Sequence, residues 1–460
     1  MAKSFRIGLI SPYGNLSAIG LRYISACLRD AGWQTRMIFL PDPDEVFYKV
    51  KTPPQNYAST LLDQVVELCR GLDLVGITVM SNYFGRARAL TKAIHQNLGI
   101  PVIWGGIHPT VRPEESLEWA DYVCVGEGEE AMIDLVRALE TGADTTNIPN
   151  IWTRSPSGEV IANPSRAIYP NLDDLPLPDY DLNEHFILFE ERVVPITPAL
   201  LSYHLKHNFA RETKLAYMIS TTRGCPYRCT FCCDTALADM FPKWRQLRRR
   251  SPEKIIGEIN TIRNLIPNLE AVMFIDSTFL AVRNEFLEVF SQMYREQVGL
   301  PFFIQTTPGT VKEDKIKPLV EAGLVDVGMG MQTGSTRIRH MYERFETNEQ
   351  ILEAGQLLQK YKAHIPYPTY DLISDNPYET DEDKLETLKL LYELPRPHAI
   401  HFFSLTFYPG TKMYEMALKD GLIRDHEQDI YAKSYVSLAP TYYNFVLWCL
   451  HRNWPRWILW

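Results

Sequence analysis

Short apolar runs alternate with helical patterns along the first 145 residues. The runs predict five strands, at 5–10, 36–40, 73–80, 101–106 and 120–126. Apolar residues at helical spacing predict helices at about 21–33, 84–98 and 128–140. Because strands separated by helices pair in parallel through right-handed crossovers, residues 1–145 are predicted to form a doubly wound α/β domain.

The loops that follow these strands are the expected ligand-binding positions, because ligands in such sheets bind at the carboxyl ends of the strands. The loops are rich in glycine, serine and asparagine, which permit close approach of the backbone to a ligand. They are residues 11–20, 81–85, 105–110 and 126–130.

The remainder of the chain shows a second pattern of strands and helices. Residues 146–215 are rich in proline and aspartate and are interpreted as a connector, and residues 413–460 as a tail with helical tendency. Between them, residues 216–412 predict six consecutive βα units, which form a barrel or partial barrel. The six strands are expected at 216–220, 271–275, 301–305, 325–331, 368–374 and 399–407.

Composition narrows the class of protein. The chain has 45% hydrophobic and 22% charged residues, as in globular enzymes, and a net charge of −9 argues against a general nucleic-acid binder. No secretory signal or long apolar span is visible, so a cytoplasmic location with reduced thiols is expected. Four scattered cysteines are interpreted as buried core residues: Cys27, Cys69, Cys124 and Cys449.

Three further cysteines stand close together directly after the first strand of the predicted barrel. Cys225, Cys229 and Cys232 form a C-x3-C-x2-C pattern within "TTRGCPYRCTFCC". A structural zinc site is the alternative, but it needs a fourth ligand; Cys233 adjoins Cys232 and is badly aimed, and the loop has no histidine. Three thiolates instead suit a [4Fe–4S] cluster with one iron open to a small molecule.

The segment "GCPYRCTFCC" resembles the signature of radical S-adenosylmethionine (SAM) enzymes, and the resemblance extends over about 216–410. It implies a radical SAM (β/α)6 partial TIM barrel in which the three cysteines hold the cluster and SAM chelates the fourth iron. Electron transfer to SAM would then give a 5′-deoxyadenosyl radical that abstracts a hydrogen atom.

Other barrel segments are similar to SAM-binding elements of that family. The resemblance implies that Tyr227 and Phe231 shield the cluster and flank adenine, although simple loop packing is the alternative. The segments "MFIDSTF", "GMGMQTGS" and "DLISDNPYET" match strand-end elements, where ordinary polar residues are the alternative. The implied contacts to SAM there are Asp276, Ser277 and Gln332.

The segment "KWRQLRRR" (243–250) places five basic residues soon after the cysteines. It is either a solvated face or a site where Arg245 pairs with the SAM carboxylate, since guanidinium binds carboxylates bidentately. Basic charge there also suits an acidic electron donor of the flavodoxin or ferredoxin type.

The N-terminal domain is similar to the cobalamin-binding domain that precedes many radical SAM barrels, and a nucleotide-binding Rossmann domain is disfavoured because G-x-G-x-x-G is missing after the first strand. The loop after that strand also has no D-x-H-x-x-G element, so the resemblance implies no protein imidazole on cobalt; some relatives keep the domain without using cobalamin. His108 either contacts the corrin or orders its loop. The other expected contacts are Thr78, Ser81, Gly105, Gly106 and Gly126.

These resemblances imply a cobalamin-dependent radical SAM methyltransferase acting on an unactivated carbon. A ring-forming reaction, as in the anaerobic porphyrin-ester cyclase, is the alternative within the class, and a non-catalytic cobalamin or iron–sulfur sensor is the alternative outside it. The substrate, a small molecule or a lipid, is not specified. The aromatic C-terminus "NFVLWCLHRNWPRWILW" packs on the protein itself or makes peripheral membrane contact.

Overall fold

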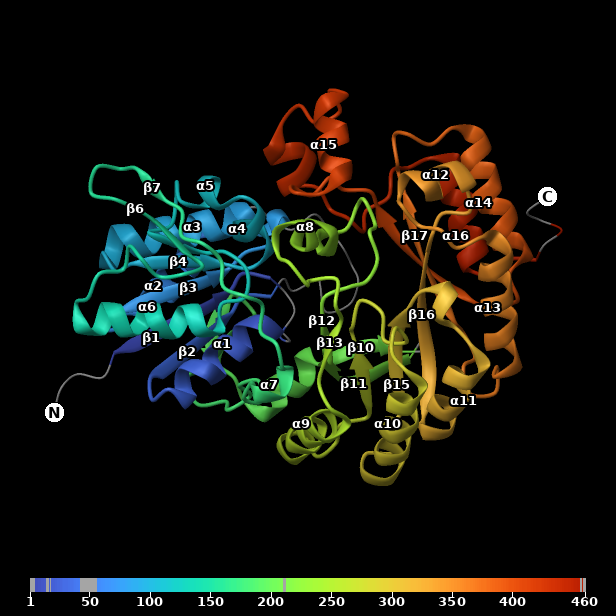
Figure 1. Ribbon diagram of the computed structural model, residues 1–460, viewed down its shortest axis with the longest axis horizontal. Helices are drawn as coiled ribbons and strands as arrows, with labels where there is room; N and C mark the ends of the chain where they lie inside the picture. The colour runs from blue at the N-terminus through green and yellow to red at the C-terminus, as the bar shows by residue number, and fades with distance from the viewer. Residues whose placement is uncertain are drawn as a thin grey trace. The chain divides into compact units, whose positions relative to one another are not determined.

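The computed structural model describes residues 5–13, 16, 18–41, 56–209, 212–455 and 457. The chain divides into two compact units, each built around one mainly parallel sheet (Figure 1). The predicted α/β architecture, a doubly wound domain followed by a partial barrel, is confirmed. The first unit comprises Met1–His204, Phe231–Trp244 and Phe407–Lys433, and the second comprises Leu205–Thr230, Arg245–Thr406 and Ser434–Trp460.

The first unit contains a nine-stranded sheet in the order β7-β6-β5-β4-β3-β1-β2-β8-β9. All neighbouring pairs from β5 to β8 are parallel, and the remaining pairs are antiparallel. The strands are β1 (Arg6–Ser11), β2 (Gln34–Phe39), β3 (Leu74–Thr78), β4 (Val102–Gly105), β5 (Tyr122–Cys124), β6 (Ile151–Arg154), β7 (Val160–Ile161), β8 (His185–Phe189) and β9 (Arg192–Pro195).

The predicted connector at 146–215 differs from the structure. Its residues supply β6 to β9, which extend this sheet on both sides, and a helix of the first unit at Pro198–His204. They also supply the edge strand of the second unit, at Lys206–Phe209. The sequence pattern is weak there because these short strands, at or next to the edges of the sheet, are partly exposed rather than buried like the central ones.

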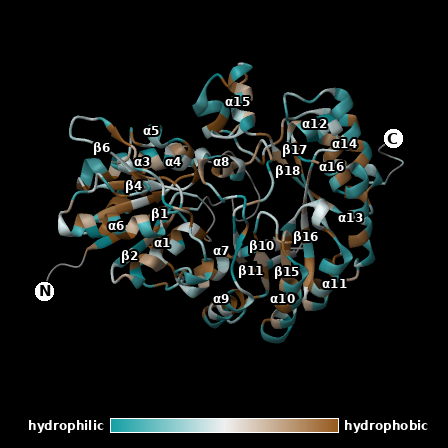
Figure 2. Ribbon diagram, in the orientation of Figure 1, coloured by the Kyte–Doolittle hydropathy of each residue, from teal (hydrophilic) through white to brown (hydrophobic). Residues whose placement is uncertain are grey.

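Helices cover both faces of the first sheet. Helix α1 packs with α6, and α2 packs with α3 (Figure 1). The central strands are almost wholly buried between these pairs, and Figure 2 shows the apolar colour concentrated on them. The helices are α1 (Ile19–Asp30), α2 (Ser59–Cys69), α3 (Phe84–Leu98), α4 (Ile107–Val111), α5 (Pro113–Ser116), α6 (Glu129–Thr141), α7 (Pro198–His204), α8 (Cys233–Met240) and α15 (Lys412–Lys419).

The second unit contains a seven-stranded sheet in the order β10-β11-β14-β15-β16-β17-β18. Its last six strands run parallel, and β10 forms an antiparallel edge. A separate pair, β12 with β13, is antiparallel. The strands are β10 (Lys206–Phe209), β11 (Glu212–Ile219), β12 (Thr222–Arg223), β13 (Arg248–Arg249), β14 (Ala271–Phe274), β15 (Phe302–Thr306), β16 (Leu324–Gln332), β17 (Thr369–Ser374) and β18 (Ala399–Ser404).

The helices of this unit line one side of its sheet (Figure 1). The serine cap expected at 251 is present, because the Ser251 side chain accepts a hydrogen bond from the Lys254 amide at 3.2 Å. In the described residues, no helix is both long and apolar enough to cross a membrane. The helices are α9 (Pro252–Leu265), α10 (Asn284–Gln297), α11 (Glu313–Ala322), α12 (Thr336–Met341), α13 (Asn348–Lys360), α14 (Asp381–Glu393) and α16 (Tyr442–His451).

The expected tail at 413–460 is not one element. Helix α15 and a π-helical turn at Glu427–Tyr431 belong to the first unit, whereas α16 belongs to the second and covers the outer side of β18. Arg456 and Trp460, which are part of the aromatic C-terminus, lie outside the described residues.

Candidate active site

The cysteine loop begins just after β11 and β12 and ends at the start of α8. Cys225 and Cys229 are buried, Cys232 is half-buried and Cys233 is exposed, and all eight cysteines are free. Among the described residues, no three His, Cys, Asp or Glu side chains are already arranged around one point to hold a metal ion. The loop therefore supplies the thiols together on nine residues, without a preformed cage.

The donor set fits an iron–sulfur cluster. Thiolate is the ligand such clusters prefer, and two of the three sulfurs lie out of solvent. A hydrogen bond with Cys233, and then burial, raise the pKa of Cys232 well above its usual value. Metal binding at Cys232 would therefore release a proton.

Arg344 is a functional candidate that the sequence analysis missed. Its Nη1 lies 3.7 Å from the Cys229 sulfur, and its Nη2 donates to the carbonyl of Gly330 at 2.7 Å and pairs with Glu346 at 3.1 Å. A buried guanidinium at this distance stabilises the thiolate form of a cysteine. Nothing in the sequence pattern marks it, because it lies 115 residues beyond Cys229.

Hydrogen bonds with the C-terminal end of α12 and with the residue after β15 hold the cysteine loop in place. Thr230 donates through its amide to the Tyr342 carbonyl at 3.2 Å and through its hydroxyl to the Met341 carbonyl at 2.8 Å. The Tyr227 hydroxyl lies 2.9 Å from that of Thr307. Tyr227 is half-buried in this packing, so the loop-packing alternative describes the geometry seen, and contact with adenine stays a prediction.

Arg245 also contacts the loop. Its Nη1 donates to the carbonyl of Tyr227 at 3.0 Å, within the second unit. The neighbouring basic residues are not a solvated face: Arg250 is buried and pairs with Glu258 at 2.7 Å, and burial lowers the pKa of Arg249 to about 10 despite the nearby Asp276 carboxylate. Most of the segment 243–250 is therefore packed against the barrel rather than solvated.

Asp276 follows β14 and is held by the first strand's loop. It accepts hydrogen bonds from the Thr221 amide at 2.8 Å, the Thr221 hydroxyl at 3.0 Å and the Thr222 hydroxyl at 2.5 Å. The carboxylate is buried, whereas Ser277 beside it is exposed. Asp276 thus braces the segment leading to Cys225, and of the two residues Ser277 is the one that remains accessible to a ligand.

Gln332 ends β16 in the left-handed backbone region, with φ of 67°. Its side-chain amide folds over Gly330, where an added Cβ would lie 2.9 Å from the Gln332 nitrogen. The register between β16 and β17 shifts at this point. A non-glycine residue with positive φ is strained and is typical of functional positions.

The first sheet has its topological switch point between β1 and β3, since the order β2-β1-β3-β4-β5 is that of flavodoxin-like folds. Thr78 ends β3 at this place, and its hydroxyl lies 3.0 Å from that of Tyr13, just beyond β1. Burial raises the pKa of Tyr13. The structure thus brings Thr78 to the crevice where a cofactor tail is expected; Gly14, Asn15 and Ser17 of the same loop are outside the described residues.

Ser81 and His108 contact each other in the interior. The Ser81 hydroxyl lies 3.1 Å from His108 Nδ1, and the ring packs against Phe84 and Tyr431 at centroid distances of 4.8 and 5.5 Å. Burial, with a smaller effect from Arg112, lowers the pKa of His108 to about 3. The lowered pKa favours the neutral imidazole. These contacts order the loop, and contact of His108 with the corrin stays a prediction.

The three predicted glycines have different surroundings. Gly106 has φ of 102°, and an added Cβ would lie 3.0 Å from the Val79 carbonyl oxygen. At Gly126 (φ 91°) an added Cβ would lie 2.6 Å from the ring of Phe241. Gly105 is the most open, because only Cys124 lies within 4 Å of its added Cβ.

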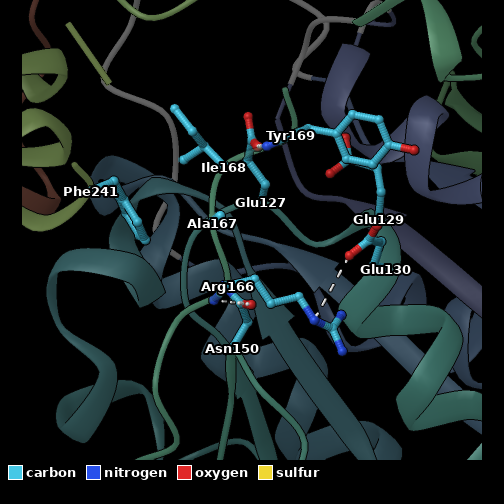
Figure 3. Close-up of a pocket in the computed structure, with 9 residues that line it drawn as sticks. All are labelled: Glu127, Glu129, Glu130, Asn150, Arg166, Ala167, Ile168, Tyr169 and Phe241. Carbon is cyan, nitrogen blue, oxygen red and sulfur yellow. Dashed lines mark hydrogen bonds and ion pairs between the residues drawn. The ribbon is translucent and has the colours of Figure 1, made fainter. Parts of the chain in front are cut away.

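Beside Gly126, beyond the end of β5, the first unit contains a pocket of about 300 Å³ (Figure 3). Its polar wall is internally paired: Glu127 accepts a hydrogen bond from the Tyr169 amide at 2.6 Å, and Arg166 pairs with Asp134. It is lined by Glu127, Glu129, Glu130, Asn150, Arg166, Ala167, Ile168, Tyr169 and Phe241.

Comparisons with known families agree with this arrangement. The sequence model of the Radical SAM superfamily matches residues 219–391, and that of the B12 binding domain matches residues 5–136. The chain belongs to the radical SAM enzymes that carry an N-terminal cobalamin-binding domain. Its cofactors are a [4Fe–4S] cluster, SAM and cobalamin, as the sequence analysis predicted.

Several characterised and uncharacterised proteins are similar in sequence. An uncharacterised methyltransferase of Pyrococcus horikoshii is 26% identical, over 76% of this chain and 70% of its own. An anaerobic magnesium-protoporphyrin IX monomethyl ester cyclase of Rubrivivax gelatinosus is 30% identical, over 65% of this chain and 51% of its own. The chain thus spans about half the length of that cyclase.

Solved structures share the fold of the whole chain. The radical SAM methyltransferase TsrM from Kitasatospora setae superposes with a TM-score of 0.70 at 19% identity, covering 92% of this chain and 77% of its own. The cobalamin-dependent enzyme OxsB gives a TM-score of 0.66 at 18% identity, covering 98% of this chain and 61% of its own. At these identities the likeness shows the fold alone.

Proposed function

We propose that this enzyme is a cobalamin-dependent radical SAM methyltransferase that acts on an unactivated carbon. The observation that carries the proposal is the presence, in one chain, of the three-cysteine loop at the strand ends of a partial barrel and of a flavodoxin-order sheet matching the B12 binding domain. The methyltransferase names of the Pyrococcus horikoshii relative and of TsrM support it.

When bound, the cluster supplies the electron that cleaves SAM, and cobalamin supplies the methyl group. The chain's own residues position these groups. Thr230 and Tyr227 hold the cysteine loop against the end of α12 and the residue after β15, Arg344 favours the thiolate of Cys229, and Asp276 keeps the approach to Cys225 rigid. Such rigidity fixes the reacting atoms at close range, which is the main way a protein accelerates a two-partner reaction.

The cofactor contacts assigned by resemblance remain part of the proposal. On the barrel side, the accessible Ser277 and the strained Gln332 lie at the strand ends where SAM is expected. On the sheet side, Thr78 and Gly105 lie at the carboxyl ends of β3 and β4. Substituting these residues should weaken SAM or cobalamin retention without removing iron.

The test is anaerobic purification and reconstitution, followed by iron, sulfide and cobalamin quantitation and mass spectrometry of the products of methyl-deuterated SAM. Under reductant, with the substrate, we expect 5′-deoxyadenosine, S-adenosylhomocysteine and a deuteromethylated product. Intact SAM after reduction, despite a full complement of iron, would contradict the proposal.

A second candidate is a ring-forming reaction, which the 30% identity to the protoporphyrin ester cyclase favours. The products distinguish the two. Methyl transfer yields S-adenosylhomocysteine together with 5′-deoxyadenosine, whereas cyclisation yields 5′-deoxyadenosine alone.

An electron donor of the flavodoxin or ferredoxin type belongs to the proposal, together with a cytoplasmic location. Arg228 is exposed within the cysteine loop and offers a positive contact for an acidic donor. In R228E we expect reduction of the cluster by flavodoxin to slow about tenfold, while reduction by dithionite, which needs no docking, is unchanged. Equal slowing with both reductants would contradict the docking of an acidic electron donor at Arg228.

The proposed function also includes peripheral contact of the C-terminal region with a lipid surface. Along α16 and beyond it, Tyr442, Phe445, Trp448 and Trp457 are exposed, and Arg452 lies 5.3 Å from the Trp448 ring. Aromatic residues beside a basic one are typical of helices that lie in a membrane interface. We expect the protein to float with anionic liposomes and the W448S/F445S variant not to do so; the wild type remaining unbound would exclude this contact.

A further inference from the structure

The two faces of the barrel sheet have different neighbours. One face packs under the helices: Phe274 of β14 lies 5.5 Å from Phe290 of α10, and Phe402 of β18 lies 5.8 Å from His451 of α16. Alternate residues of the same strands point to the opposite, inner face. At its amino end this inner face is closed by a separate apolar cluster, formed by Ala216, Ala271, Met273 and Phe303.

Towards the later strands the inner face carries a pair of titratable residues. Asp371 of β17 and His401 of β18 are direct neighbours in register, and His401 Nδ1 lies 3.3 Å from an Asp371 carboxylate oxygen. Asp371 is nearly buried, with 16% of its side chain exposed, but 52% of the His401 side chain is exposed. A half-exposed imidazole in the middle of a parallel strand is unusual, since such strands are normally buried on both faces.

The geometry leaves one nitrogen of the ring directed away from its partner. Because Nδ1 faces Asp371, Nε2 is the atom available to a ligand. Desolvation lowers the pKa of His401, but the interaction with Asp371 and the charge of Asp326 on β16 outweigh it, so the pKa is raised. These two carboxylates are the charged groups that face the ring, and together they favour the protonated form, whose Nε2–H is a donor.

An aromatic surface adjoins this donor on the same strand. Phe403 lies two residues beyond His401 and therefore on the same face, about 7 Å along the strand. Its ring stacks with that of Tyr435 at a centroid distance of 6.3 Å and an angle of 14°, and Tyr435 is 40% exposed. The inner face thus offers a flat aromatic surface next to a positioned hydrogen-bond donor.

We propose that His401 is a substrate-binding residue of this barrel and that Asp371 positions it. The Nε2–H of His401 donates to a carboxylate oxygen of a small substrate, whose planar ring packs against Phe403 and Tyr435. This rests on the proposed function in one respect, that the substrate of a radical SAM barrel lies against the inner face of the sheet.

The experiment uses the reconstituted full-length enzyme and two matched probes, indole-3-carboxylate and indole-3-carboxamide, titrated calorimetrically under anaerobic conditions. The probes share the ring and differ in the charge that His401 would meet. Because a hydrogen bond to a charged group contributes about 1.5–3 kcal/mol, the wild type should bind the carboxylate about tenfold or more tightly than the carboxamide. The preference should weaken as pH rises through the raised pKa of His401.

Variants locate the effect. H401Q should bind both probes equally, and D371N should move the pH midpoint of carboxylate binding downward, which a purely structural role of Asp371 would not do. His364 is an exposed histidine on the loop after α13, so H364Q is the matched control and should retain the preference.

Three results would overturn the proposal: equal binding of the two probes by the wild type, no binding of either, or a carboxylate preference that survives in H401Q. Cleavage of SAM by the wild type and H364Q under dithionite is measured alongside. If SAM is not cleaved, the proposed function is contradicted. If SAM is cleaved but any of those three binding results is found, only the role of His401 is contradicted.

Discussion

The two parallel sheets of this enzyme differ in how far their polar residues are exposed. The first sheet is covered by helices on both faces, and its polar strand-end residues turn inward: Ser81 and His108 are buried and bonded to each other. The second sheet is covered by helices on one face, and His401, in the middle of a strand beside the nearly buried Asp371, remains accessible. A sheet covered on both faces can present chemistry only at its ends, whereas a half-covered one can present it along a whole face.

The most buried site candidates of both units make contacts that hold loops in place. In the barrel, the oxygens of Asp276 accept hydrogen bonds from Thr221 and Thr222, and its contact with SAM stays a prediction. In the first sheet, His108 packs against Phe84, and its contact with the corrin stays a prediction.

The largest effect is expected at the barrel rim. Replacing Cys225, Cys229 and Cys232 together with alanine should abolish iron binding and reduce reductive SAM cleavage by about a thousandfold or more, because the three predicted cluster ligands are then missing and Cys233 alone cannot hold a cluster. Iron and sulfide assays with product mass spectrometry would measure this. C233A is the control and should retain its iron; loss of iron in C233A alone would show that Cys233 is a ligand.

Next in size is the brace at the start of the loop. D276N should lower the free energy of unfolding of the barrel by about 2–4 kcal/mol, since an amide leaves a buried donor unsatisfied and removes the charge beside Arg249. Hydrogen exchange of residues 214–223 would report it. D381N, at a side chain that is 99% exposed, should change exchange little. Unchanged protection in D276N would mean that Asp276 is not a structural brace.

The first sheet should be sensitive to a single methyl group at β4. G106A places a Cβ 3.0 Å from the Val79 oxygen on a backbone with φ of 102°, and should destabilise the first unit by about 1–3 kcal/mol. G20A, in α1 with nothing within 4 Å, is the matched control and should be neutral or slightly stabilising. Thermal unfolding of the two variants, followed through the first unit's hydrogen exchange, makes the comparison; equal stability would be the contrary result.

The smallest effect concerns pH. The pKa of His108 is lowered from 6.5 to about 3 in the folded state, so the unfolded chain takes up a proton first as pH falls. Stability from the neutral ring is fully present above pH 6.5 and is lost as pH falls towards 3; the loss is about 1.4 kcal/mol at pH 5.5. H108Q should lack this component. Identical slopes of unfolding free energy against pH in wild type and H108Q would contradict the burial of a neutral ring.

The sequence was sufficient for what depends on continuous patterns. The buried runs of β1, β3 and β16 and the helix cap at Ser251 are local signals, and the structure has them where they were expected. The partly exposed strands β6 to β9, at or next to the edges of the sheet, were not found, because their short length leaves no periodicity to detect.

The site could be predicted only where its residues lie close together in the sequence. The cysteine pattern lies within one loop, but the partners of Asp276 and Cys229 are 54 to 115 residues away and depend on strand order. His401 leaves a faint signal, a polar residue at an alternating position in "AIHFFS", which gains meaning only when β17 sets Asp371 beside it.

The first unit is completed by a segment that the ribosome makes late. Tyr431 packs on His108 and Phe84, and its hydroxyl donates to Glu115 at 2.7 Å. During synthesis, nearly three hundred residues are therefore added after the cobalamin-binding sheet before Tyr431 is available to cover this part of its surface. A fragment ending near residue 145 would lack Tyr431 and would leave the rings of Phe84 and His108 without this cover.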